Sequence, residues 1–257
     1  MALMEGLDMG SDHDVFFEGT WQIPGLYLHD WPDRYIHTNF DLAANIDPTK
    51  LKRAAFIGAV SAWFLANMSD DDVPAVLSLL QRNALKRGAE LIERRTPLSA
   101  SDAAAVTDVH FSVERRKVHS IERFTTLSEE NRTAAMSFLS ELQTLLAAPE
   151  VVAGTGRDET IYERNPNIEG PMRAFGYSYL SDKYDPEKFK ALRLPKYTGA
   201  HGSSGEYMYE ALNFVNGIRT VSDIRDWLTA ELGPVPIEFL AEYLLALESI
   251  GVIQETR

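Results

Sequence analysis

Apolar and polar positions follow a helical period through the middle of the chain. Apolar residues recur every three or four positions in three stretches, residues 69–92, 101–123 and 128–148, with charged residues between them. Ser69 precedes three consecutive aspartates, and acidic residues of this kind are favoured in the first turn of a helix. The pattern predicts three amphipathic helices.

A different helix is predicted just before these three. Asp47 and Pro48 have the residue types of an N-cap and a first helical turn. Residues 54–66 that follow are apolar on nearly every side, yet the run is shorter than the ~20 residues needed to span hydrocarbon. We therefore expect a helix that covers the face of a sheet. If the strands of that sheet are not in this chain, the helix exposes an apolar face and favours association.

A strand is predicted upstream of this helix. Residues 23–28 form a short apolar run bounded by turn residues, as in a strand buried within a sheet. Tyr35, Ile36, His37 and Thr38 come next, in a loop. Ligands of open α/β sheets bind just beyond the carboxyl ends of strands, which makes His37 a candidate ligand. The alternative is that His37 is an ordinary surface histidine.

The last hundred residues divide into an irregular part and a helical part. Residues 150–204 are rich in glycine, proline and tyrosine, and we expect them to lie across other elements. Helices are predicted at 207–213, 221–232 and 236–250, followed by a strand at 252–254. Three helices and a strand resemble a winged-helix module, a shape used for DNA binding or for protein contacts.

Charge favours protein contacts over DNA. The chain has 38 acidic against 25 basic residues and a net charge of −13, which disfavours nucleic acid as a partner. From Ser203 onward there are nine acidic residues and three arginines, and residues 236–250 have three glutamates and no basic residue. A recognition helix of this composition would repel phosphate. The chain has no cysteine, which excludes disulfides and thiolate metal sites.

Residues 10–47 carry a family resemblance. The sequence reads Gly-Ser-Asp-His-x-x-Phe at residues 10–16, then Ile-Pro-x-Leu, then Tyr-x-His-Thr-x-x-Asp at 35–41, and finally Asn-Ile-Asp at 45–47. This order resembles the end of the catalytic domain in two-zinc exopeptidases of the aminopeptidase Y and bacterial leucyl aminopeptidase family. The resemblance covers about residues 5–68.

The resemblance assigns roles to four residues. His37 corresponds to the last zinc ligand of the family's two-zinc site, while Asp12 and His13 match a corner near the site that does not itself bind metal. Asp41 matches the motif aspartate, which orients the loop or contacts a metal ligand without binding the metal itself. One position departs from the pattern, because Leu42 stands where family members usually have threonine.

Most of such a site is missing here. The family takes most of its other ligands and its glutamate base from a His-x-Asp motif, a Glu-Glu pair and a further aspartate, all of which precede the His-Thr motif. Only ten residues precede Ser11. We therefore expect a fragment of a zinc metallopeptidase that lacks the N-terminal half of its catalytic domain and is inactive alone. The whole enzyme would hydrolyse peptides at a chain terminus. The alternative is a non-catalytic interaction protein built around the winged-helix-like module.

The predicted fold class is α+β and predominantly α-helical. Residues 1–68 are expected to be the last strand and helix of an α/β peptidase domain, residues 69–202 a helical and irregular extension, and residues 203–257 the winged-helix-like module. No transmembrane segment is expected. Localisation stays open, because a signal peptide preceding Met1 would direct a soluble protein to the periplasm or outside the cell. Substrate preference, aminopeptidase or carboxypeptidase action, and oligomeric state also stay open.

Overall fold

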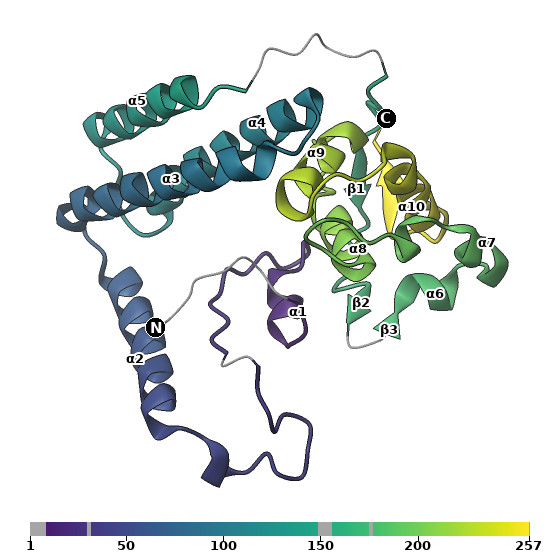
Figure 1. Ribbon diagram of the computed structural model, residues 1–257, viewed down its shortest axis with the longest axis horizontal. Helices are drawn as coiled ribbons and strands as arrows, with labels where there is room; N and C mark the ends of the chain where they lie inside the picture. Colours follow the sequence, from purple (N-terminus) through teal and green to yellow (C-terminus); the bar gives the residue numbers. More distant parts are fainter. Residues whose placement is uncertain (1–8, 30–31, 149–155, 175–176, 257) are drawn as a thin grey trace.

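Helices dominate the computed structural model, which describes residues 9–29, 32–148, 156–174 and 177–256 (Figure 1). Strands are confined to two small antiparallel pairs within these residues. The predominantly helical class is confirmed. None of the helices in the described ranges has the length and apolar character that crossing a bilayer requires.

The N-terminal part contains two helices of unequal length. Helix α1 spans His13–Phe17, a 3-10 turn η1 spans Ala43–Asn45, and helix α2 spans Pro48–Asn67. Helix α2 begins where the sequence predicts, because the Asp47 carboxylate accepts hydrogen bonds from the backbone N–H groups of Thr49 (2.8 Å) and Lys50 (3.4 Å).

The strand predicted at residues 23–28 does not form. These residues are extended and exposed, and no strand is assigned between residues 9 and 68 within the described ranges. A strand needs a neighbouring backbone for its hydrogen bonds, and no other described segment lies alongside this one as a strand. The expected α/β portion is thus represented by α2 and by an extended segment without a sheet.

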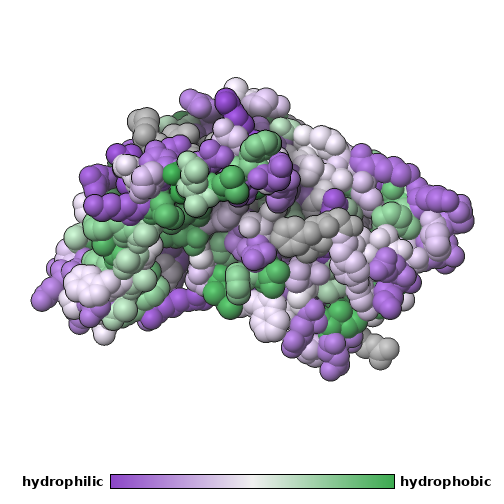
Figure 2. Space-filling model, turned by 90° about the horizontal axis from the view of Figure 1, so that it is seen from below, coloured by the Kyte–Doolittle hydropathy of each residue, from purple (hydrophilic) through white to green (hydrophobic). Residues whose placement is uncertain are grey.

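Helix α2 has no buried residue. It projects away from the remaining helices in Figure 1, and the view from below in Figure 2 shows apolar surface gathered on the side where α2 lies. Phe56 and Trp63 are 66% and 67% exposed. The expectation of an exposed apolar helix is confirmed.

Three helices form the middle unit, as predicted. They are α3 (Val73–Arg95), α4 (Ala100–His119) and α5 (Glu129–Leu145), with 3-10 turns η2 (Asp70–Asp72) and η3 (Ser120–Arg123). Ser69 and Asp72 form a reciprocal capping box at the start. Phe111 is fully buried among apolar side chains of all three helices.

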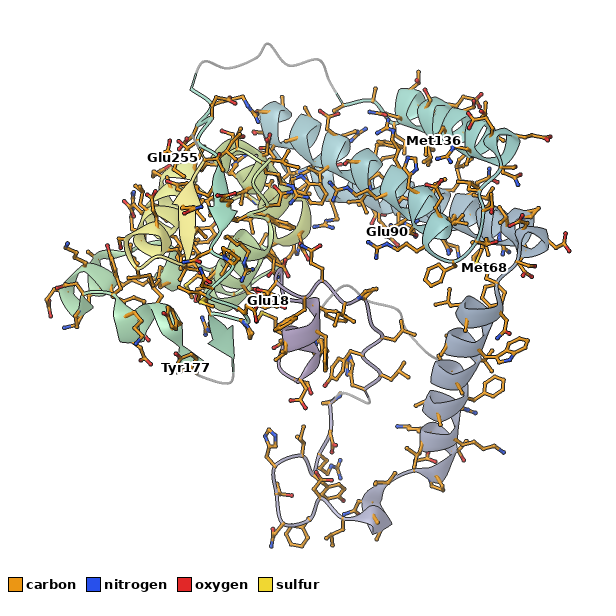
Figure 3. All side chains as sticks on the ribbon, turned by 180° about the vertical axis from the view of Figure 1, so that it is seen from behind. Glu18, Met68, Glu90, Met136, Tyr177 and Glu255 are labelled. Atoms are coloured by element: carbon orange, nitrogen blue, oxygen red, sulfur yellow. The ribbon has the colours of Figure 1, made fainter. Side chains whose placement is uncertain are left out.

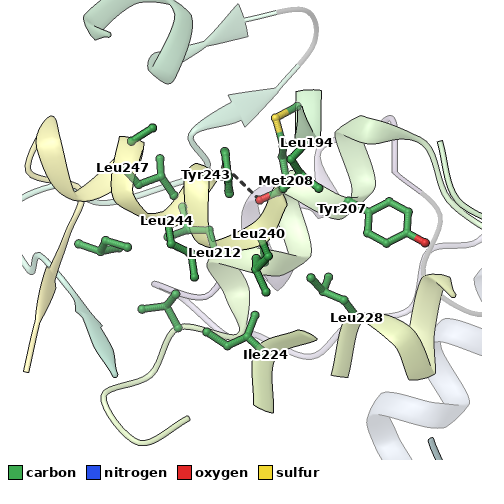
Figure 4. Close-up of a cluster of buried hydrophobic side chains, with 14 of the residues drawn as sticks. Leu194, Tyr207, Met208, Leu212, Ile224, Leu228, Leu240, Tyr243, Leu244 and Leu247 are labelled. Atoms are coloured by element: carbon green, nitrogen blue, oxygen red, sulfur yellow. Dashed lines mark hydrogen bonds between the residues drawn. The ribbon is translucent and has the colours of Figure 1, made fainter. Parts of the chain in front are cut away.

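The C-terminal unit has a larger core. Helices α8 (Ser204–Asn213), α9 (Val221–Leu232) and α10 (Ile237–Ser249) are followed by strand β4 (Ile253–Glu255), close to the predicted bounds. Figure 4 shows side chains from these helices meeting in one cluster, where the Tyr243 hydroxyl donates to the Met208 carbonyl at 3.1 Å.

The irregular segment belongs to this same core. Strand β1 (Tyr162–Arg164) pairs antiparallel with β4, and Tyr162, Met172 and Leu194 are buried among the side chains of the C-terminal helices. The remaining elements are β2 (Arg173–Ala174), β3 (Tyr177–Ser178), α6 (Tyr179–Lys183), α7 (Pro186–Ala191) and η4 (Leu194–Lys196). Side chains on both sides of residue 203 thus contribute to one core, and residues 156–256 are called the C-terminal module below.

Candidate functional site

The candidate zinc ligand lies in a loop built from local hydrogen bonds. Residues 32–47, the His37 loop, connect the extended segment to α2. Thr38 closes a turn by donating its hydroxyl to the Tyr35 carbonyl at 2.6 Å and accepting from the Phe40 N–H at 3.2 Å. The Asn45 side-chain amide donates to the Phe40 carbonyl at 2.6 Å. The loop is thus ordered by its own polar side chains, because it has little contact with a core.

His37 has an unusual backbone conformation at this turn. Its φ is 60°, in the left-handed region that residues other than glycine adopt rarely. The side chain is exposed. Non-glycine residues in this region cost about 1–2 kcal/mol and cluster at functional sites, where surrounding contacts hold them. The predicted placement of His37 in an exposed loop is confirmed, and its role as a ligand stays a prediction.

Asp41 lies four residues further on and is also exposed. Its backbone N–H donates to the Thr38 carbonyl at 3.2 Å. Within the described residues, hydrogen bonds of the Thr38 and Asn45 side chains order the loop. The assignment of Asp41 as a residue that supports a ligand stays a prediction.

The loop ends at the carboxylate of Asp47. The backbone N–H of Thr49, together with that of Lys50, holds the pKa of the Asp47 carboxyl below its usual value. The carboxylate therefore stays ionised and bonded to the first turn of α2. This fixes the end of the His37 loop to a regular helix.

Asp12 and His13 lie at the start of α1, apart from this loop. Asp12 occupies the N-cap position in helical conformation, without a side-chain capping bond. The His13 imidazole stacks on the Tyr27 ring, with centroids 4.0 Å apart and planes inclined by 15°. Its Nε2 atom is 3.3 Å from the carboxylate of Asp14, whose side chain is buried. Both residues thus belong to a corner that folds back on the extended segment.

The structure does not bring the two parts of the candidate site together. In Figure 1 the His37 loop extends well away from α1. Among the described residues, no three histidine, aspartate or glutamate side chains gather at metal-binding distance. One imidazole cannot hold zinc at useful affinity, because a site needs several ligands fixed in geometry. These residues therefore do not form a zinc site by themselves.

Sequence reasoning missed the residues that order these two parts. Thr38 and Asn45 belong to the quoted motifs, but nothing in their spacing shows that they close turns. The apolar run predicts Tyr27 only as part of a strand. In the structure its ring stacks on the imidazoles of His13 and His29, and the Tyr27 and His29 centroids are 5.0 Å apart. The motif therefore combines candidate ligands with residues that shape the backbone.

Comparison with known proteins adds no relative. No family model, no curated protein and no solved structure matches this chain.

Proposed function

We propose that residues 9–68 are the C-terminal part of a zinc exopeptidase domain and that His37 is one of its zinc ligands. The remaining ligands and the catalytic base come from residues outside these 257. In this proposal the protein hydrolyses peptides at a chain terminus. The last three helices and strand of the C-terminal module, α8–α10 and β4, resemble a winged helix, and in this proposal they contact protein.

The observation that carries the proposal is the concentration of uncovered apolar side chains beside the motif. Of the 24 exposed large apolar side chains in the described part, 16 lie between Phe16 and Leu65. Soluble proteins rarely expose apolar patches of this extent unless another surface covers them. The rest of a peptidase domain is the cover that the motif of His37 indicates.

The conformation of His37 is a second support. The turn around Thr38 holds the residue in the left-handed region, with the imidazole free of the molecule's own core. A ligand that must reach metal bound largely by another part of a domain needs this exposure. A neutral imidazole in such a position can donate a nitrogen lone pair to zinc.

The proposal is tested by extending the chain upstream. The reading frame that encodes residues before Met1 should contain a His-x-Asp motif and a Glu-Glu pair. The extended protein should hydrolyse aminoacyl-p-nitroanilides in the presence of zinc, and the 257-residue chain should not. Hydrolysis by the 257-residue chain alone, or an upstream sequence without these motifs, would contradict the proposal.

A further inference from the structure

The segment that contains the Asp12–His13 corner docks on the C-terminal module. Residues 10–20, called the docking segment here, are separated from α8 and β1 by more than 140 positions in the sequence. Figure 1 shows α1 against the module, and Figure 3 shows Glu18 where the chain after α1 meets it. The contact depends on specific side chains of the module.

The first contact is a buried ion pair. Glu18 is 1% exposed, and its carboxylate pairs with the Arg164 guanidinium from β1. The other carboxylate oxygen accepts from the Thr20 N–H at 2.9 Å. A carboxylate this deeply buried is tolerated only when it is paired and hydrogen-bonded. Removing the Arg164 charge would therefore leave the buried Glu18 carboxylate without a cation, which is energetically unfavourable.

Two contacts from α8 hold the backbone of the docking segment. The Tyr209 hydroxyl donates to the Asp14 carbonyl at 2.6 Å, and the Asn213 side-chain oxygen accepts from the Gly19 N–H at 2.8 Å. Tyr209 is 5% exposed, and burial raises the pKa of its hydroxyl, which stays a donor. These bonds fix the backbone on both sides of Glu18.

Gly19 lets the two chains approach closely. A Cβ atom at this position would lie 3.2 Å from the Cα atom of Asn213 and 2.7 Å from the Arg164 guanidinium. The backbone of α8 cannot move aside as a flexible side chain can. The docking segment and the module are therefore matched in shape as well as in charge.

We infer that the C-terminal module holds the docking segment in place and that Arg164, Tyr209 and Asn213 are positioning residues for the Asp12–His13 corner. One of these contacts is made by the Asp14 carbonyl, next to His13, and the His13 imidazole stacks on the Tyr27 ring. Fixing α1 on the module therefore fixes the His13 imidazole. The catalytic meaning of this positioning rests on the proposed peptidase function, whereas the docking itself does not.

Hydrogen exchange in the 257-residue chain tests the docking. Tyr209→Phe removes one hydroxyl and leaves the apolar ring in the core. We expect exchange of the amides of residues 13–20 to become about tenfold faster, as the loss of one buried hydrogen bond implies. Arg164→Met should have at least as large an effect, and Arg164→Lys should restore part of the protection.

Arg193→Met is the matched control. Arg193 forms an ion pair with Glu242 within the module, at 2.5 Å, and does not touch the docking segment. In Arg193→Met, the exchange rates of the amides of residues 13–20 should stay within about twofold of those in the unchanged chain, since exposed ion pairs contribute little to stability. The imidazole protons of His13 should also show a ring-current shift from Tyr27 that Arg164→Met weakens and Arg193→Met keeps.

Unchanged exchange and an unchanged His13 shift in both Tyr209→Phe and Arg164→Met would overturn the inference. Equal acceleration in Arg193→Met would also overturn it, because it would show general loosening of the module. Neither measurement requires zinc or peptidase activity. Failure of the docking is thus distinguishable from failure of the proposed function.

Discussion

The Arg225 guanidinium on α9 lies 2.5 Å from the Asp102 carboxylate on α4, with both side chains mostly buried. The same guanidinium donates to the Val235 carbonyl at 3.2 Å. Nearby, Arg94 of α3 donates to the carbonyls of Ala230 and Glu231 at the end of α9, at 2.6 and 2.9 Å. A cation at a helix C-terminus is favourable, which explains the position of Arg94. Helix α9 therefore joins the C-terminal module to the three-helix unit through two arginines, Arg94 and Arg225.

Arg225→Met should destabilise the chain by about 1–3 kcal/mol, because it leaves the Asp102 carboxylate without its cation in a mostly buried place. Urea unfolding of this variant, of Asp102→Asn and of the double variant measures the coupling between the two residues. The double variant should be less destabilised than the sum of the two single variants. Strict additivity would show that the pair contributes nothing.

Glu210 should make stability fall as pH rises. This carboxyl is 8% exposed on α8, and burial is the main cause that raises its pKa to about 8, with the charges of Glu231 and Glu206 adding to the effect. The unfolded carboxyl titrates near its ordinary value of 4.5. Between these two values the native state binds more protons than the unfolded state, so stability is lost as pH rises through this window.

Glu210→Gln should reduce this dependence, and the Glu231 carboxyl, whose pKa burial also raises, keeps the remainder. Urea unfolding at pH 5 and pH 8 should show a loss of stability in the unchanged chain, and the variant should be more stable than it at pH 8 by about 1–3 kcal/mol, the size of a buried-group penalty. Glu238→Gln, at an exposed position of α10, is the control and should keep the slope. The prediction fails if Glu210→Gln and the unchanged chain have the same slope.

The sequence predicted helix positions well because capping and periodicity are local. Helix α9 was expected at 221–232 and spans Val221–Leu232, and Thr220 and Asp223 form its capping box. Its neighbours were also found within a few residues. These signals are contained within a few turns of chain, so that no knowledge of tertiary contacts is needed.

Contacts between distant segments could not be predicted. Strand β1 pairs with β4, so that Tyr162 faces Glu255, and nothing in either stretch identifies its partner. The strand at 23–28 was expected from its apolar run alone, but pairing decides whether a strand forms. The same reason applies to Glu18 and Arg164, and to the left-handed backbone of His37, which only the folded turn reveals.

The exposed face of α2 should cause self-association. Phe56 and Trp63 lie two helical turns apart and are both about two thirds exposed. Replacing both with glutamine should shift the chain from assemblies to monomer in sedimentation velocity at micromolar concentration. Unfolding free energy should change by less than about 0.5 kcal/mol per site, because neither side chain is buried. Leu245→Gln, at a 55% exposed position of α10, should not alter association.

A concentration-independent monomer in the unchanged chain would contradict this prediction. So would dissociation by Leu245→Gln to the same extent as by the α2 variant. The first result would show that the apolar face of α2 stays exposed to solvent without driving association. The second would place the contact elsewhere on the surface.

The winged-helix-like part of the C-terminal module, from Ser203 onward, should not bind DNA. Its two arginines after Ser203 in the described ranges are engaged, since Arg219 lies 4.3 Å from the Trp227 ring and donates to the Phe214 carbonyl, while Arg225 pairs with Asp102. Titration with duplex DNA at low salt should give no binding at micromolar concentration. Micromolar binding that weakens steeply with added salt would contradict the charge argument.

Zinc content of the upstream-extended protein tests the central claim most directly. His37→Asn removes the imidazole but keeps a residue that tolerates the left-handed conformation, and His201→Asn replaces another exposed histidine as a control. The account predicts about two zinc ions per chain in the unchanged and His201→Asn proteins, and loss of about one ion with at least a tenfold lower hydrolysis rate in His37→Asn. A His37→Asn protein with unchanged zinc content and an unchanged rate would contradict it.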